Sequence, residues 1–304
     1  MKENVVFACD IGGSKLLCGF LTEDGKIICK KKIPLLHNTS ISILEDNIET
    51  LFEELYENNP EIETVACGIN IPGLADAKNG IWTYSCFSGI ENYPISKRIA
   101  KKLKLPVFIE NDVNACALAE QTYGICRDCD NFLWVTVSNG VGGGLVLNGK
   151  IYRGAFGGAG EFGHIVIEPD GLPCPCGHHG CIEALAAGPA ISKRYEAITK
   201  KRLTAESISV LARSGDENAV SVMKKTGEYI GTGLGKVASI LNLEKYVLGG
   251  GVMQSFDLIK EDIESAFRKE AFAFPNQKAE ILPTELKYEA GLFGAAATAW
   301  LSLK

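Results

Sequence analysis

Two stretches of this chain, DIGGSKLLCGFLTEDGKI at residues 10–27 and NGVGGGLVLNGKI at residues 139–151, follow one pattern. Each follows an apolar strand and contains a glycine-rich turn, a strand, a tight Asp-Gly or Asn-Gly turn and the start of another strand. Asn-Gly and Asp-Gly are preferred dipeptides of short β-hairpin turns. Glycine hairpins are also common in unrelated folds, but a pattern that recurs in both halves of a chain predicts two related lobes.

Short apolar strands alternate with helical patterns along the rest of the chain, which is typical of an α/β fold. No stretch rich in proline or serine separates these segments, so we expect the two lobes to be tightly joined. We expect strands at residues 5–10, 16–22, 26–32, 64–71, 106–110, 132–138 and 245–251, and helices at residues 42–56, 95–103, 111–124, 218–241 and 291–300.

The composition, with 46% hydrophobic and 22% charged residues among 304, is that of an ordinary globular protein. This length favours two lobes over a single core. The net charge of −6 disfavours nucleic acid or an anionic membrane as main partner, because both are negatively charged. The apolar run in the opening MKENVVFACDIGG is too short for a signal peptide, and no segment offers ~18 uncharged apolar residues. We therefore expect a cytoplasmic protein whose eleven cysteines are reduced.

Metal-ligating side chains crowd into HIVIEPDGLPCPCGHHGCIE, residues 164–183. One imidazole and three thiolates complete a closed tetrahedral site, so the stretch predicts a structural zinc ion. His178 and His179 are competing ligands, and unconnected reduced cysteines are the alternative. A redox dithiol is disfavoured, because Cys-x-Cys differs from the usual Cys-x-x-Cys spacing. The expected ligands are His164, Cys174, Cys176 and Cys181.

A Cys-x-x-Cys pair does occur elsewhere, at Cys126 and Cys129 in ICRDCD. No second pair stands near it, which favours a surface turn over a metal or redox site. The sequence leaves the role of these two thiols open.

The first glycine turn, DIGGSK, places a carboxylate and two glycines at the end of a strand. Backbone amides at Gly12 and Gly13 can approach phosphate oxygens while Asp10 holds a magnesium ion or its water. Such a motif also closes ordinary hairpins, but the second turn, SNGVGGG, could cradle more phosphate. That turn fails the dinucleotide fingerprint at Leu145, where glycine is needed, and the P-loop pattern at Ile151, where serine or threonine is needed. Its glycines are Gly140, Gly142, Gly143 and Gly144.

Candidates for substrate chemistry lie in IENDVNACALAE and around the cysteine cluster. Asn111 and Asp112 stand between a strand and a helix, where loop side chains face a cleft. An aspartate there can take the proton of a hydroxyl that attacks a phosphoryl group, although either residue could equally be a helix N-cap. Glu161 and Glu183 flank the cluster. Carboxylates bind vicinal sugar hydroxyls well, but either acid could simply be a solvated surface residue.

Together these motifs resemble the ROK sugar kinases, a family named for repressors, open reading frames and kinases. DIGGSK and NGVGGG resemble its two phosphate motifs, ENDVNACALAE its catalytic segment, GEFGHIVIEPDGLPCPCGHHGCIEA its long signature and KYVLGGGV its adenosine-side turn. The resemblance covers nearly the whole chain and implies an α/β, actin-like (ribonuclease H-like) two-lobed ATPase fold. We expect a smaller lobe from residues 1–115 plus 290–304, and a larger lobe from residues 116–289 that carries the zinc-binding insertion.

The resemblance also implies roles for individual residues. Asp112 is implied to be the catalytic base, and His164 to bind zinc through one ring nitrogen and the sugar through the other. The implied cofactors are ATP, Mg²⁺ and structural Zn²⁺. Implied sugar contacts are Gly73, Asn111, Asp112, Glu161, His164 and Glu183; implied zinc ligands are His164, Cys174, Cys176 and Cys181; implied ATP contacts are Asp10, Gly12, Gly13, Ser14, Lys15, Gly140, Gly142 and Gly143.

The chain departs from the family pattern at two places. Cys86 and Ile90 stand where many members have asparagine and tryptophan. A thiol does not replace the hydrogen bonds of an amide, which leaves the specificity for glucose open. Asn139 stands where the phosphate loop often has threonine, and it still offers a donor.

The activity that the resemblance implies is transfer of the γ-phosphoryl group of ATP to the 6-hydroxyl of a hexose or N-acetylhexosamine. A sugar-responsive repressor of the same family is one alternative. We expect no DNA-binding domain, because Asp10 lies near the N-terminus and no basic recognition helix precedes it. A non-catalytic sugar-binding or regulatory member is another alternative, which ATP turnover would decide. By analogy with the family we expect a homodimer with a small-molecule sugar as its partner.

Overall fold

The computed structural model describes residues 2–36, 39–85 and 89–304. The chain forms two compact units, and it enters each of them more than once. Unit 1 holds Met1–Asp128, Arg153–Gly158 and Tyr288–Lys304, and unit 2 holds Cys129–Tyr152 and Ala159–Lys287.

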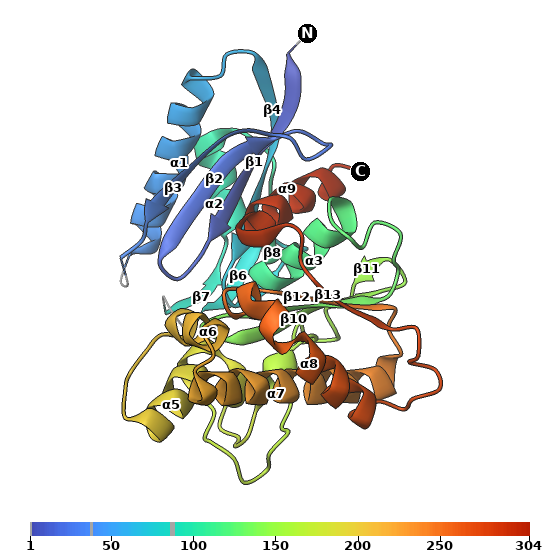
Figure 1. The fold of residues 1–304 in the computed structure, drawn as a ribbon. Helices are drawn as coiled ribbons and strands as arrows, with labels where there is room; N and C mark the ends of the chain where they lie inside the picture. The colour runs from blue at the N-terminus through green and yellow to red at the C-terminus, as the bar shows by residue number, and fades with distance from the viewer. Residues whose placement is uncertain (1, 37–38, 86–88) are drawn as a thin grey trace. The chain divides into compact units, whose positions relative to one another are not determined.

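The sheet of unit 1 is built from the first glycine hairpin and two strands that follow it (Figure 1). Its strand order is β3-β2-β1-β4-β8. Strand β2 is antiparallel to both of its neighbours, whereas β1, β4 and β8 run parallel to one another. The strands are β1 (Glu3–Ile11), β2 (Lys15–Leu21), β3 (Ile27–Pro34), β4 (Ile62–Ile71) and β8 (Val107–Asn111).

The sheet of unit 2 repeats this arrangement strand for strand. Its order is β11-β10-β9-β12-β13, with β10 antiparallel to both neighbours and β9, β12 and β13 parallel. Asn148 and Gly149 both have positive φ at the β10–β11 turn, as the expected two-residue hairpin turn requires. The related lobes that the two glycine hairpins predicted are therefore confirmed. The strands are β9 (Phe132–Val137), β10 (Val141–Leu147), β11 (Lys150–Ile151), β12 (Lys245–Gly249) and β13 (Glu280–Pro283).

Side chains of β1 alternate between two apolar layers of unit 1. Val5, Phe7 and Cys9 belong to a buried cluster with helices α1 and α2, whereas Val6 and Ala8 pack with α9. This alternation follows from the two-residue period of a strand. The elements beside the sheet are α1 (Ile41–Glu57), β5 (Leu74–Asp76), β6 (Ile81–Ser85), β7 (Ile90–Tyr93), α2 (Ile95–Leu103), α3 (Asp112–Thr122), η3 (Lys287–Glu289) and α9 (Ala290–Ser302).

Helix α9 lies directly on the sheet and on α3, because glycines remove side chains at both contacts. A Cβ atom added to Gly68 of β4 would lie 1.9 Å from the carbonyl oxygen of Ala295. A Cβ atom added to Gly294 would lie 2.6 Å from the backbone of Ala115 in α3. The C-terminal helix therefore packs between the sheet and α3, and the first residue of α3 is the candidate base, Asp112.

The helices of unit 2 cover its sheet with the largest buried apolar cluster of the described chain. Helix α7 packs closely on α8, and an added Cβ atom at Gly231 of α7 would lie 2.2 Å from the carbonyl oxygen of Ile263. The helices are η1 (Phe162–His164), α4 (Ile182–Ala186), α5 (Gly188–Thr199), α6 (Ala205–Arg213), α7 (Glu217–Leu241), η2 (Val252–Ser255) and α8 (Phe256–Glu270).

The strands and helices that the sequence analysis expected are present, with ends within two residues of the predicted ones. Elements that it did not name include β5–β7, β13, α4–α6 and α8. The expected division of the lobes at residues 115 and 116 falls inside α3. Among the described residues, no helix combines the length and the apolar character needed to cross a membrane.

Candidate active site and metal centre

The first glycine turn brings a carboxylate to the start of α9. Asp10 is half-buried at the end of β1, and desolvation raises its pKa, although the charge of Lys15 and a hydrogen bond from Asn70 oppose this. Asn70 also donates a hydrogen bond from Nδ2 to the carbonyl oxygen of Gly291 (2.5 Å). A Cβ atom on Gly291 would lie 2.5 Å from the carboxylate of Asp10, so a larger residue there would displace that carboxylate. Neither Asn70 nor Gly291 was singled out by the sequence analysis.

The turn itself is held by its backbone and is open above Gly13. The amide of Gly12 donates to the carbonyl oxygen of Lys15 (2.9 Å), and the amide of Leu35 donates to the carbonyl oxygen of Ser14 (2.9 Å). A Cβ atom added to Gly13 would meet nothing within 4 Å, and the φ of Gly13 is not positive. Packing within the chain therefore does not explain the glycine at position 13. Close approach of a ligand to the backbone would explain it, because a side chain would block that approach.

Asn111 is the N-cap of α3. Its Oδ1 accepts hydrogen bonds from the amides of Val113 and Asn114 (both 3.0 Å). Its Nδ2 donates to the carbonyl oxygen of Gly73 (2.8 Å) and to Oδ1 of Asp112 (2.9 Å). The capping role that the sequence left open between Asn111 and Asp112 thus belongs to Asn111.

Asp112 is the first residue of α3 and its carboxylate is fixed on one side. Oδ1 accepts from Nδ2 of Asn111 and from the amide of Val113 (3.1 Å). Desolvation, and then the charge of Asp10, raise the pKa of Asp112 to about 7. A carboxylate whose pKa lies near neutrality is suited to accept a proton at physiological pH.

Gly73 belongs to the same constellation in unit 1. It has a φ of 99°, and a Cβ atom there would lie 2.2 Å from the carbonyl oxygen of Tyr84. Only glycine therefore fits at this position. Through the bond to Asn111, the structure brings Gly73, Asn111 and Asp112 together.

The second glycine turn packs against acidic segments of unit 2. Oε2 of Glu183, in the first turn of α4, accepts a hydrogen bond from the amide of Val141 (3.0 Å). A Cβ atom on Gly140 would lie 2.7 Å from that same oxygen. A Cβ atom on Gly143 would lie 2.7 Å from the carbonyl oxygen of Gly160, the residue before Glu161. Two of the glycines expected to contact phosphate thus also have packing roles; Gly142 is half-buried and Asn139 is exposed.

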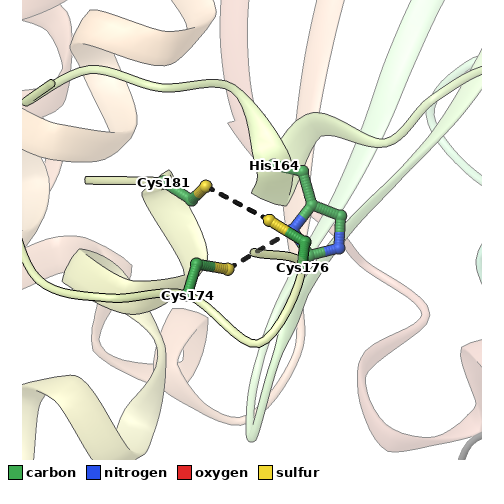
Figure 2. Close-up of side chains that lie close together, drawn as sticks. All are labelled: His164, Cys174, Cys176 and Cys181. Atoms are coloured by element: carbon green, nitrogen blue, oxygen red, sulfur yellow. Dashed lines mark hydrogen bonds between the residues drawn. The ribbon is translucent and has the colours of Figure 1, made fainter. Parts of the chain in front are cut away.

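Four ligand atoms converge in the loop that the sequence singled out (Figure 2). His164, Cys174, Cys176 and Cys181 each offer one atom, and these atoms lie within 4.8 Å of one another. Sγ of Cys174 lies 3.6 Å from Nδ1 of His164, and Sγ of Cys176 lies 3.6 Å from Sγ of Cys181. One imidazole and three sulfurs at this spacing fit a tetrahedral zinc ion.

The competing histidines lie at the edge of this group. Nδ1 of His178 is 3.5 Å from Sγ of Cys176, and hydrogen bonds from the backbone and ring of His178 lower the pKa of Cys176 to about 6. Neither His178 nor His179 belongs to the four converging residues. The second ring nitrogen of His164, Nε2, lies 3.8 Å from Oε2 of Glu161. The imidazole thus presents one nitrogen to the sulfurs and the other to a proposed sugar-binding acid.

Cys126 lies in a turn and Cys129 follows it, but both thiols are buried, so their predicted place on the surface is wrong. The expected specificity position Cys86 lies outside the described residues, whereas Ile90 is half-buried against the apolar cluster of unit 1.

The duplicated five-stranded sheet, with a glycine hairpin opening each copy, is that of the actin-like two-lobed ATPases, as the sequence led us to expect. Residues 6–301 match the model of the ROK family, and the chain belongs to that family.

The chain is 31% identical to a glucokinase of Halalkalibacterium halodurans, over 99% of this chain and 96% of that protein. It is 28% identical to the xylose repressor of Bacillus subtilis, over 93% of this chain and 73% of the repressor. The crystal structure of a ROK family glucokinase from Streptomyces griseus, in complex with glucose and AMPPNP, has a TM-score of 0.84 and 30% identity, covering 98% of this chain and 99% of that one.

Proposed function

We propose that this protein is a sugar kinase that transfers the γ-phosphoryl group of ATP to the 6-hydroxyl of a hexose or N-acetylhexosamine, with Asp112 as general base. The observation that carries the proposal is the state of Asp112: its pKa lies near neutrality, and one carboxylate oxygen is held by Asn111 and Val113. In phosphoryl transfer the attacking hydroxyl must be held in line and lose its proton late. A carboxylate fixed at Oδ1 leaves Oδ2 to accept that proton.

The sugar contacts that we propose are Gly73, Asn111, Asp112, Glu161, His164 and Glu183. The hydrogen bond from Val141 to Glu183 leaves that carboxylate further lone pairs for a sugar hydroxyl. Asn111 contributes mainly by orienting Asp112, since its amide group already makes four hydrogen bonds. The glucose complex of the Streptomyces griseus relative supports a sugar of this class.

ATP and Mg²⁺ would be bound through the two glycine turns. The open backbone at Gly13 and the carboxylate of Asp10 support this assignment, as does the AMPPNP complex of the relative. Magnesium when bound would neutralise charge on the phosphates, and Asp10 would hold it or its water. The contacts proposed are Asp10, Gly12, Gly13, Ser14, Lys15, Gly140, Gly142 and Gly143.

Zinc would have a structural role. With His164, Cys174, Cys176 and Cys181 as ligands it would be four-coordinate, with no position for a reacting molecule. Its ligands lie in the loop between Glu161 and Glu183, so the ion would order both acids and the ring of His164.

A non-catalytic, sugar-binding regulator of the same family is the second candidate, because the xylose repressor is also a relative. A coupled assay of ADP release separates the two. We expect turnover with at least one sugar among glucose, mannose, fructose, allose, GlcNAc, ManNAc and a β-glucoside. Sugar binding by calorimetry without ADP release for any of them would favour the regulator. Light scattering of the same preparation tests the homodimer expected by analogy, and fractionation of the producing cells tests the expected cytoplasmic location.

A further inference from the structure

A short segment of chain leaves unit 2 after β11 and belongs to unit 1. This segment, Arg153–Gly158, carries a cation to a buried acid. The guanidinium of Arg153 donates a short hydrogen bond to Oε2 of Glu110, the residue directly before the N-cap of α3. The Glu110 side chain is 2% exposed and that of Arg153 is 42% exposed. A carboxylate buried to this extent needs a counterion, and Arg153 supplies it.

The other oxygen of Glu110 holds the segment that bears the candidate base. Oε1 accepts hydrogen bonds from the amide of Asn111 (3.0 Å) and from Nδ2 of Asn114 (3.2 Å). Asn111 in turn donates to Oδ1 of Asp112. An unbroken series of contacts therefore runs from Arg153 through Glu110 and Asn111 to the carboxylate of Asp112.

We propose that Arg153 is a positioning residue for phosphoryl transfer, acting through Glu110 to hold Asn111 and Asp112 in the geometry of the reaction. This proposal rests on the proposed function. Two features of the pair favour positioning over simple stability. Glu110 uses one oxygen for Arg153 and the other for the helix start, so the ion pair bears directly on the N-cap. The chain that carries Arg153 also continues within a few residues to Glu161, a proposed sugar contact.

Unit 1 offers a matched control in which the same kind of pair has no link to the site. The Glu45 side chain is 1% exposed and accepts hydrogen bonds from Nε and an Nη atom of Arg98 (both 3.0 Å). The Arg98 side chain is 54% exposed. The other hydrogen bond to Glu45 comes from the hydroxyl of Tyr93, which is not a proposed site residue. Removing Arg98 therefore exposes the protein to the same loss of a buried ion pair without touching α3.

The test compares Arg153→Met, Arg153→Lys and Arg98→Met with the wild type. For the sugar that the wild type turns over best, we expect Arg153→Met to lower kcat about tenfold to a hundredfold, since small misplacements at a reacting centre have effects of this size. Sugar Kd should stay within about threefold, because ground-state contacts survive. Arg153→Lys, which keeps the charge but not the fork of donors, should recover part of kcat. Arg98→Met should lower Tm at least as much as Arg153→Met but keep kcat within about twofold of the wild type.

Hydrogen–deuterium exchange gives a reading that needs no activity. Amides of residues 110–114 should exchange faster in Arg153→Met than in the wild type, and at wild-type rates in Arg98→Met. Equal kcat losses in Arg153→Met and Arg98→Met, or an Arg153→Met enzyme with near-normal kcat and unchanged exchange at 110–114, would overturn the proposal. If Arg153→Met does not fold, Arg153→Lys carries the same comparison. A wild-type protein without turnover on any sugar, combined with the expected exchange pattern, would contradict the proposed function and leave the link from Arg153 to the helix start in place.

Discussion

The two glycine turns occupy equivalent places in two equivalent sheets, yet their glycines meet different neighbours. In the β1–β2 turn, a side chain added at Gly13 would point into open space. At the β9–β10 turn, a side chain added at Gly140 would collide with Glu183, and one added at Gly143 of the following strand β10 would collide with the backbone of Gly160. Strand β1 also carries the carboxylate of Asp10 at its next-to-last position, whereas β9 contains no acid.

This difference shows how one duplicated hairpin can serve two purposes. The first turn is open at Gly13 and has an acid beside it, which suits a phosphate and its metal. The second turn and the start of β10 contact Glu183 and Gly160. Glu183 and Glu161, the residue after Gly160, are the proposed sugar-binding acids. We infer that the second turn bears directly on the proposed sugar-binding acid Glu183, and that the first turn does not.

The largest effect is expected from a substitution of Asp112, whose pKa is raised in part by the charge of Asp10 beside the first turn. In Asp112→Asn the side chain keeps its size and its hydrogen bonding but loses the ability to take a proton. We expect kcat to fall by ~10²–10⁴, with sugar Kd within about tenfold and unchanged zinc content. Because Asn111 is the N-cap, Tm should barely change. Near-normal turnover would remove Asp112 from the mechanism.

Loss of the metal should weaken sugar binding, because the metal-binding loop at residues 164–181 lies between Glu161 and Glu183. We expect about one zinc per chain in protein purified without chelator. Cys176→Ser should lower the zinc content and weaken sugar binding by about tenfold, while ATP binding changes less. Cys29→Ser is the control, because Cys29 is half-buried in unit 1 and far along the chain from the metal-binding loop. A wild-type preparation free of zinc by mass spectrometry would contradict the metal assignment.

Alanine substitutions in the two turns test the comparison itself. Gly13→Ala adds a methyl group in open space, so Tm should not change, but the KM for ATP should rise by about tenfold because the added group meets the phosphates. Gly140→Ala adds a methyl group against the flexible end of Glu183. The Glu183 side chain should then shift, and sugar binding should weaken by a similar factor. If Gly140→Ala leaves sugar binding unchanged, or Gly13→Ala weakens it as much as Gly140→Ala does, the two turns do not differ in the way we infer.

The effect of pH on kcat/KM is graded and is smallest close to pH 7. Asp112 must be ionised to accept a proton, and its pKa is raised to about 7. Because protonation removes the base, kcat/KM should decline below pH 7 and approach a tenfold loss per pH unit well below it. The neighbouring charge of Asp10 contributes to this shift, so Asp10→Asn should move the acid limb to lower pH in whatever activity remains. An acid limb that stays in place would show that Asp10 does not act on Asp112.

The sequence by itself determined the features that depend on neighbours along the chain. Three such features arise within short stretches, where backbone preference and ligand spacing are decisive. They are the Asn148-Gly149 turn, the helix from Glu217 to Leu241, and the convergence of three cysteines with His164. The repeat of the glycine hairpins even predicted the duplication of the sheet.

Only the tertiary structure decided the rest, because the remaining features depend on contacts between distant residues and on burial. Asn70 meets Gly291 across 221 positions of sequence, and Arg153 meets Glu110 across 43. The raised pKa of Asp112 comes from desolvation and from the charge of Asp10, which no local pattern encodes. The burial of Cys126 and Cys129 is likewise a property of the folded chain that their local sequence did not reveal.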